Sequence, residues 1–135
     1  MNYTFIDGAD RIDPAEVQQL LKTTYWANQR SIETIRASMC HSSCHGVYPE
    51  GESKLIGFAR VITDYATTYY LCDVIIDPAY RHQGLGKALV SHVVSLPEFA
   101  PLRGLLLTRD AHGLYAHFGF ERADGRAMVK APDRS

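Results

Sequence analysis

Residues 74–89, VIIDPAYRHQGLGKAL, give the clearest indication of how this chain folds. The stretch opens with three β-branched apolar residues at 74–76, which are typical of a buried strand. Asp77-Pro78 ends this strand, because proline has no amide hydrogen for a β-ladder and restricts the residue before it. Apolar residues then recur at offsets of three and four over residues 85–96, which predicts an amphipathic helix of about three turns.

The loop between this strand and this helix is suited to binding a phosphate group. Gly84 and Gly86 lie two residues apart, so several backbone amides can converge there without a Cβ atom in the way. The amino terminus of the following helix adds the positive end of its dipole. Arg81 and Lys87 flank the glycines and can add positive charge beside a diphosphate.

Residue spacing excludes two other kinds of phosphate-binding loop. A Walker loop requires glycine at position 81 and serine or threonine at position 88, where this chain has Arg81 and Ala88. A dinucleotide fingerprint requires a third small residue at position 89 and an acidic residue about 20 positions later. This chain has Leu89 and then three leucines at 105–107, so neither motif fits.

The segment RHQGLG, residues 81–86, resembles the signature of the GCN5-related N-acetyltransferase (GNAT) superfamily, which is Arg or Gln followed by x-x-G-x-G or x-x-G-x-A. Every fixed position matches. The resemblance implies that the loop amides from Gln83 to Lys87 hold the pyrophosphate of coenzyme A, and that the pantetheine arm lies along residues 74–76. The cofactor-binding residues that it predicts are Val74, Ile75, Ile76, Arg81, His82, Gln83, Gly84, Leu85, Gly86 and Lys87.

A second segment, LYAHFGF at residues 114–120, is similar to the family's helix that ends in an aromatic-x-x-x-Gly-Phe turn. By that similarity, Tyr115 is the catalytic residue that protonates the leaving thiolate. A tyrosine suits this role, because its ordinary pKa of about 10 leaves it protonated at neutral pH. The alternative is that Tyr115 is an aromatic residue of the core. The order of elements from about residue 12 to residue 130 also follows the family.

The rest of the chain predicts elements that agree with this resemblance. A capped helix begins at Pro14 and a second one follows Ser31. The strands expected are residues 2–6, an antiparallel meander over 45–49, 54–62 and 69–76, and a buried strand at 104–108. We expect a short helix over residues 111–118, capped by Asp110, and a closing hairpin around residues 124 and 125.

The expected fold class is therefore α+β, an α/β three-layer sandwich with a GNAT-like mixed, mostly antiparallel sheet flanked by helices. Residues 1–135 are expected to form a single domain of this type.

Asp73 is the only charged residue in the apolar run over residues 69–76, and a buried carboxylate is costly unless it is paired. It is a catalytic candidate that holds the substrate ammonium or relays its proton. The alternative is a carboxylate that faces solvent or forms an internal salt bridge. A backbone amide of Val74 or Ile75 is expected to polarise the thioester carbonyl, because the family separates two strands here.

An acceptor pocket is expected where the early helices and the middle strands face the thioester. Its aromatic candidates can equally belong to the core, Asp110 can equally cap a helix, and His112 is a candidate base. The predicted substrate-binding residues are Tyr25, Trp26, Tyr65, Tyr69, Asp110 and His112.

Composition limits the other functions. A formal net charge of -1 argues against nucleic acid as a partner, and no apolar stretch approaches the roughly 18 residues of a membrane-spanning helix. Three cysteines do not make a complete disulfide framework. The segment CHSSCH, residues 40–45, offers ligands that zinc accepts, but its spacing matches no zinc module. We expect no metal, a cytoplasmic location, and a monomer or homodimer.

Taken together, the sequence predicts an acetyl-CoA-dependent N-acetyltransferase that transfers the acetyl group directly to a primary amine of an unidentified small-molecule or peptide acceptor. The alternative is a non-catalytic module that binds acyl-CoA or regulates another protein.

Overall fold

The computed structural model describes residues 2–133. Its centre is one sheet in which the strands follow one another in chain order. Neighbouring strands are antiparallel except the last two, which are parallel, so the sheet is mixed and mostly antiparallel as predicted. The strands are β1 (Tyr3–Asp7), β2 (Ser43–Pro49), β3 (Gly57–Thr63), β4 (Thr68–Ile76) and β5 (Arg103–Leu105).

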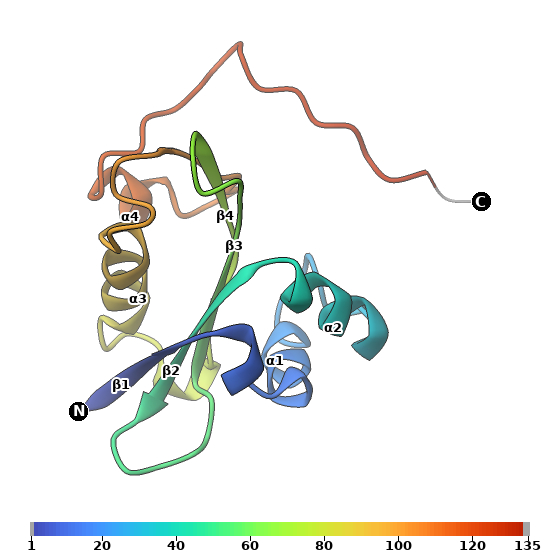
Figure 1. The fold of residues 1–135 in the computed structure, drawn as a ribbon, viewed down its shortest axis with the longest axis vertical. Coiled ribbons are helices and arrows are strands. Elements are labelled where there is room, and N and C mark those ends of the chain that lie inside the picture. The colour runs from blue at the N-terminus through green and yellow to red at the C-terminus, as the bar shows by residue number, and fades with distance from the viewer. Residues whose placement is uncertain (1, 134–135) are drawn as a thin grey trace.

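Helices cover both faces of this sheet, which confirms the expected α+β three-layer arrangement (Figure 1). One face carries α1 (Pro14–Leu21) and α2 (Ile32–Cys40), and the other carries α3 (Leu85–Val94) and α4 (His112–Ala116). Two short 3-10 helices, η1 (Ala9–Arg11) and η2 (Pro78–Tyr80), complete the set.

The first two α-helices begin where their capping residues predict. The Asp13 carboxylate accepts a hydrogen bond from the amide of Ala15, and the Ser31 hydroxyl accepts one from the amide of Thr34. Each side chain satisfies one of the amides that a helix leaves without a partner at its amino terminus.

Each face of the sheet has its own apolar core. Between the sheet and the first two helices the buried side chains include Val17, Leu20, Leu21, Ile35, Met39, Phe58 and Ile75. Between the sheet and the last two helices they include Val61, Tyr69, Leu71, Leu89, Val90, Val93, Phe99 and Tyr115. The sheet is therefore held rigidly from both sides.

A bulge in β4 changes which face of the sheet its side chains occupy. Pairing with β3 passes from Arg60 opposite Cys72 to Phe58 opposite Ile75, so β4 contains one extra residue. Asp73 lies in this bulge with a φ of 51°. Leu71, before the bulge, packs toward α3, whereas Ile75, after it, packs in the core beneath α1 and α2. A one-residue offset has this effect because side chains alternate along a strand.

Strands β4 and β5 separate soon after they begin. Their pairing joins Thr68–Tyr70 only to Arg103–Leu105, although β4 continues to Ile76. Within residues 2–133, the second half of β4 has no strand partner on that side. The main chain from Leu71 onward is therefore free to face a ligand.

The predicted buried strand at residues 104–108 is wrong in extent and in burial. The strand ends at Leu105, and the side chains of Leu105 and Leu107 are 50% and 59% exposed. The apolar run lies at the edge of the sheet rather than in its middle, so part of it remains open to solvent.

The predicted closing hairpin is also wrong. Residues 117–133 contain no strand, and Met128 is 97% exposed. Gly125 has the positive φ of 78° that suits a turn, but the segment beyond it runs away from the sheet (Figure 1). A turn signal alone does not make a hairpin when the two arms bury no apolar face.

The last helix begins differently from the prediction. The amide of Ala111 donates to the hydroxyl of Thr108, and no side chain of Asp110 caps the helix. Helix α4 is accordingly shorter than predicted, and the Asp110 side chain is 73% exposed.

Candidate active site

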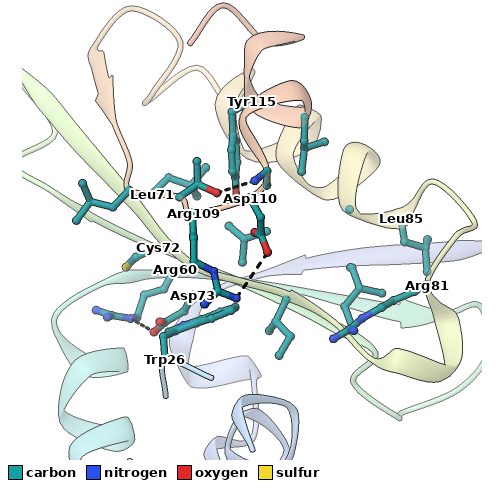
Figure 2. A pocket seen from close by; sticks show the side chains of 18 of the residues that line it. Trp26, Arg60, Leu71, Cys72, Asp73, Arg81, Leu85, Arg109, Asp110 and Tyr115 are labelled. Carbon is teal, nitrogen blue, oxygen red and sulfur yellow. Dashed lines mark hydrogen bonds and ion pairs between the residues drawn. The ribbon is translucent and has the colours of Figure 1, made fainter. Parts of the chain in front are cut away.

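A cleft of about 1110 Å³ opens where β4 and β5 separate. This volume slightly exceeds the common range of small-ligand pockets, about 300–1,000 Å³. One end is formed by the loop before α3, and the other by the aromatic segment after α1 and by β3 and the bulge of β4. Figure 2 shows Arg81 and Leu85 at one end, Trp26, Cys72 and Asp73 at the other, and Tyr115 above the middle.

The loop end of the cleft presents a row of free backbone amides. Within residues 2–133, the structure shows no hydrogen bond donated by any amide from His82 to Lys87. Gly84 is the N-cap of α3 and has a φ of 80°, and His82 has a φ of 66°. These left-handed residues turn the chain so that consecutive amides lie at the positive end of the helix dipole. Amides arranged in this way can bind an anion such as a phosphate.

Arg81 adds a fixed positive charge to this end. Its Nε atom donates a hydrogen bond of 3.1 Å to the carbonyl of Ile76, at the end of β4. Of the predicted cofactor-binding residues, those that line the cleft are Val74, Ile75, Ile76, Arg81, His82, Gly84, Leu85 and Gly86. The side chains of Gln83 and Lys87 are exposed outside it, so only their amides remain as candidate contacts.

Tyr115 is almost completely buried in the wall of the cleft, with 9% of its surface exposed. It comes from α4, and Figure 2 shows its side chain pointing from that helix toward the middle of the cleft. Burial raises the pKa of Tyr115 to about 12, so its hydroxyl keeps its proton at neutral pH. Tyr115 is therefore a core aromatic that lines the cleft with a protonated hydroxyl group.

Asp73 is paired with two arginines. Its Oδ2 atom accepts a hydrogen bond of 2.8 Å from Nη1 of Arg30 and one of 2.9 Å from Nε of Arg60. Nη1 of Arg60 also donates to the hydroxyl of Ser42, at 3.0 Å. Burial works to lower the pKa of Arg60, but the neighbouring Cys72 and Asp73 outweigh it and raise that pKa. The carboxylate thus forms the internal salt bridge that the sequence left as an alternative, at the lining of the cleft.

Three of the predicted acceptor residues line the cleft, namely Tyr25, Trp26 and Asp110. The other three do not. Tyr65 and Tyr69 pack against Phe99 instead, with ring centroids 6.0 and 5.5 Å apart. Tyr69 precedes the bulge of β4, so its side chain points toward the core beneath α3. His112, the candidate base, also lies outside the lining of the cleft.

The acceptor end also contains four residues that were not predicted from the sequence: Arg30, Arg60, Cys72 and Arg109. Arg60 is a single charge within an apolar strand, the same signal that drew attention to Asp73. Arg30 and Arg109 come from loops far apart in the chain, and no local pattern indicates that they meet. The guanidinium carbon of Arg109 lies 3.8 Å from the centroid of the Tyr25 ring.

The structure does not gather the cysteines and histidines of residues 40–45 into one site. Strand β2 begins at Ser43, so Cys44 is buried in the core while Cys40 is exposed. His45 instead forms a hydrogen bond of 2.7 Å with the carboxylate of Asp7, which also bonds to His92. Of this cluster only His45 is buried, whereas Asp7 and His92 stay partly exposed where β1 meets α3, away from the cleft.

Comparison with known proteins agrees with this fold. The profile of the acetyltransferase (GNAT) family matches residues 13–120. The chain is 29% identical over 129 residues to the histone acetyltransferase TAP1 of Glycine max, which covers 87% of this chain and 55% of that protein. It is 40% identical over 72 residues to GCN5-related N-acetyltransferase 2, chloroplastic, of Arabidopsis thaliana. This alignment covers 52% of this chain and 28% of that protein. The chain therefore spans only part of these relatives.

Solved structures extend the likeness over the whole chain. A GNAT-family structure from Xanthomonas campestris has a TM-score of 0.88 and 33% identity, and covers 98% of this chain and 94% of its own. A GNAT-family protein of Streptococcus pneumoniae has a TM-score of 0.80 at 20% identity, over 98% and 100% of the two chains, and shows the fold alone.

The fold is thus the one that these GNAT-family structures share. The chain belongs to the acetyltransferase (GNAT) family, a family of N-acetyltransferase enzymes, as its sequence motifs predict. Among the helices within residues 2–133, none has the length and apolar character needed to cross a membrane.

Proposed function

We propose that this protein is an acetyl-CoA-dependent N-acetyltransferase that transfers the acetyl group directly to a primary amine. The single observation that carries the proposal is the row of unbonded amides from His82 to Lys87. Four residues of this row line the same cleft as Tyr115, namely His82, Gly84, Leu85 and Gly86. The family of the chain supports it, because acetyl-CoA is the usual donor of GNAT enzymes.

In this proposal the donor lies along the length of the cleft. The loop amides and the dipole of α3 bind the pyrophosphate, and Arg81 adds a positive charge beside it. The pantetheine arm lies against the unpaired edge of β4, along Val74, Ile75 and Ile76. A backbone amide of Val74 or Ile75 then polarises the thioester carbonyl.

Tyr115 supplies the proton that the reaction requires. The neutral amine attacks the carbonyl carbon of the thioester and forms a C–N bond, and the C–S bond then breaks. The hydroxyl of Tyr115 gives its proton to the departing sulfur. The nitrogen loses a proton to solvent as the amide forms, and the Tyr115 phenolate takes a proton back from solvent, so the enzyme is restored. With a pKa of about 12, this hydroxyl is protonated at neutral pH.

The chemistry of Cys72 favours direct transfer over an acetylated enzyme intermediate. Among the described residues, Cys72 is the only cysteine that lines the cleft. Burial raises its pKa to about 11, so it is a neutral thiol rather than the thiolate that attacks thioesters. The proposed transfer therefore needs no enzyme nucleophile and no metal.

Asp73 has a positioning role in this account. Its Oδ2 atom accepts hydrogen bonds from both Arg30 and Arg60, and its carboxylate orients these two guanidinium groups at the acceptor end of the cleft. Because both hydrogen bonds engage the same oxygen of Asp73, the carboxylate is held by the arginines, and in this proposal the proton of the incoming ammonium is lost to solvent.

The test of this proposal measures donor binding and turnover separately. Calorimetric titration with acetyl-CoA measures the affinity, and a thiol-detecting reagent measures the release of coenzyme A in the presence of a panel of primary amines. Micromolar binding with amine-dependent thiol release is expected. Binding without release from any amine would favour the non-catalytic acyl-CoA module, and absence of binding would contradict both functions.

The acceptor, the compartment and the oligomeric state remain predictions. The Glycine max relative is named a histone acetyltransferase, but this chain spans only 55% of that protein. We therefore do not infer a histone acceptor for this chain. A cytoplasmic location and a monomer or homodimer stay as the sequence predicts.

A further inference from the structure

The acceptor end of the cleft holds more positive than negative charge. Its lining includes three guanidinium groups, those of Arg30, Arg60 and Arg109, but only two carboxylates, those of Asp73 and Asp110. The two inner arginines are the important ones, because they lie largely out of solvent. The side chains of Arg30 and Arg60 are 23% and 12% exposed.

One carboxylate oxygen accepts hydrogen bonds from both inner arginines. Nη1 of Arg30 and Nε of Arg60 lie 2.8 and 2.9 Å from the same Oδ2 atom of Asp73, whose side chain is 5% exposed. A single negative charge therefore faces two positive ones, and a surplus positive charge stays in a partly buried place. Such a charge is costly unless a counter-ion binds beside it.

The inner guanidinium groups also have N–H donors that make no hydrogen bond within residues 2–133. Arg30 uses only Nη1, and Arg60 uses Nε for Asp73 and Nη1 for Ser42. Among residues 2–133, the structure shows no hydrogen bond from Nη2 of either group. Planar guanidinium groups with free donors are suited to carboxylate and phosphate oxygens.

The ion pair of Arg109 and Asp110, near the mouth of the cleft, does not neutralise the surplus positive charge of the inner arginines. Arg109 and Asp110 are 67% and 73% exposed and 4.0 Å apart, so they form a weak surface pair that is neutral as a whole. The Arg109 guanidinium stacks on Tyr25, and Figure 2 shows it close to Trp26 at the mouth of the acceptor end.

We propose that the acceptor is a small primary amine that also carries a carboxylate or phosphate group, and that Arg30 and Arg60 bind this anionic group. The inference rests on the proposed N-acetyltransferase function and names its substrate class. An ammonium ion without an anionic partner is repelled by the surplus charge, whereas an acceptor with both charges compensates it. A small molecule fits better than a protein lysine, because the two arginines lie in the wall of the cleft rather than on the open surface.

The test compares amines that differ only in the anionic group. The two pairs are phosphoethanolamine with ethanolamine, and phenylalanine with phenylalaninamide, each measured over a pH series so that the fraction of neutral amine is known. The kcat/KM of the anionic member is expected to exceed that of its partner by roughly tenfold to a hundredfold, the usual strength of a hydrogen bond to a charged group. The pair with the larger ratio distinguishes phosphate from carboxylate.

Variants connect the preference to the arginines. Arg30→Gln is expected to bring the kcat/KM of the anionic amine down toward that of its neutral partner, while the KM of acetyl-CoA, which binds toward the other end of the cleft, changes less than twofold. Arg36→Gln is the matched control, because Arg36 is exposed on α2 and outside the cleft. Arg30 is the residue of choice because it lies in a loop, whereas Arg60 lies within β3 and its replacement risks the fold.

A binding measurement separates this inference from the proposed function. Calorimetry of both members of each pair is done on the protein saturated with desulfo-coenzyme A, a donor analogue that cannot react. Arg30-dependent binding supports the anionic site even where no thiol is released, in which case only the proposed activity fails. The inference would be overturned if both members of each pair were turned over or bound equally. It would also be overturned if Arg30→Gln lowered the kcat/KM of both members equally, or if only lysine peptides were turned over.

Discussion

Replacing Gly84 by valine should weaken the binding of acetyl-CoA without a steric conflict inside the protein. Gly84 has a φ of 80°, yet a Cβ atom built there meets no atom within 4 Å. The cost is therefore conformational: a left-handed residue with a side chain costs roughly 1–2 kcal/mol, and more when it is β-branched. The variant is expected to relieve this strain by turning its amides away from the anion.

Gly51 provides a matched control for this variant. It has a φ of 78°, it also has no atom within 4 Å of a built Cβ, and it lies in the turn after β2, outside the cleft. Gly51→Val should therefore lose a similar free energy of unfolding, roughly 1–2 kcal/mol, because the backbone penalty is the same.

The two variants should differ in donor affinity. Thermal unfolding measures the stability of each protein, and calorimetric titration measures its dissociation constant for acetyl-CoA. If about 1.4 kcal/mol or more of amide–phosphate interaction is lost, Gly84→Val binds acetyl-CoA at least roughly tenfold more weakly, while Gly51→Val binds as the wild type does. Equal dissociation constants for all three proteins would refute the assignment of the loop.

Three further predictions follow from individual side chains. Tyr115→Phe should lower kcat by roughly a hundredfold, the usual contribution of a general acid, and leave acetyl-CoA affinity within twofold; an unchanged steady-state rate would remove Tyr115 from the mechanism. Cys72→Ser should retain most of the activity, because direct transfer needs no thiolate, and acid quench with mass spectrometry should find no acetylated enzyme in the wild type; complete loss of turnover would point to a covalent intermediate. Stability should fall on acidification: burial lowers the pKa of His45 below 6.5, so the unfolded chain takes up the proton first as the pH falls below 6.5. Burial works to raise the pKa of Asp7, but its bonds to His45 and His92 hold that pKa below 3.8, so a second loss follows below 3.8. Denaturant titrations should show a steeper decline for the wild type than for His45→Gln just below pH 6.5, and parallel curves would contradict the linkage.

Much of the fold could be predicted because its signals are local. Asp13 and Ser31 cap the first two helices as their positions in the sequence suggest, and the hydrogen bonds confirm both. The two glycines before α3 indicated the loop, because they coincide with the end of an apolar strand and the start of an amphipathic helix. Local chemistry decides these features, so one sequence is enough to find them.

The elements that failed depend on tertiary packing. The leucines at 105–107 indicate a buried strand by composition, but their burial depends on whether another strand covers the edge of the sheet. The turn at Gly125 is real, yet its arms find no partner strand. Neither outcome is encoded in the segments themselves.

The acceptor end of the cleft could not be predicted from the sequence, because it too depends on tertiary structure. Nothing in the sequence around Asp73 indicates a bulge, since aspartate rather than glycine takes the positive φ there. The bulge nevertheless decides that Tyr69 points toward the core beneath α3 and that Asp73 reaches Arg30 and Arg60. Arg30 and Arg109 arrive from separate loops, so only the folded chain shows the surplus of positive charge.

The most direct test of donor binding by the loop is an amide chemical-shift titration of the ¹⁵N-labelled protein. Acetyl-CoA and acetyl-pantetheine, which lacks the pyrophosphate, are titrated in parallel. The account predicts that the amides from His82 to Lys87 shift strongly with acetyl-CoA and little with acetyl-pantetheine, while those of Val74 to Ile76 shift with both. Loop amides that do not respond to acetyl-CoA, or that respond equally to both ligands, would contradict it.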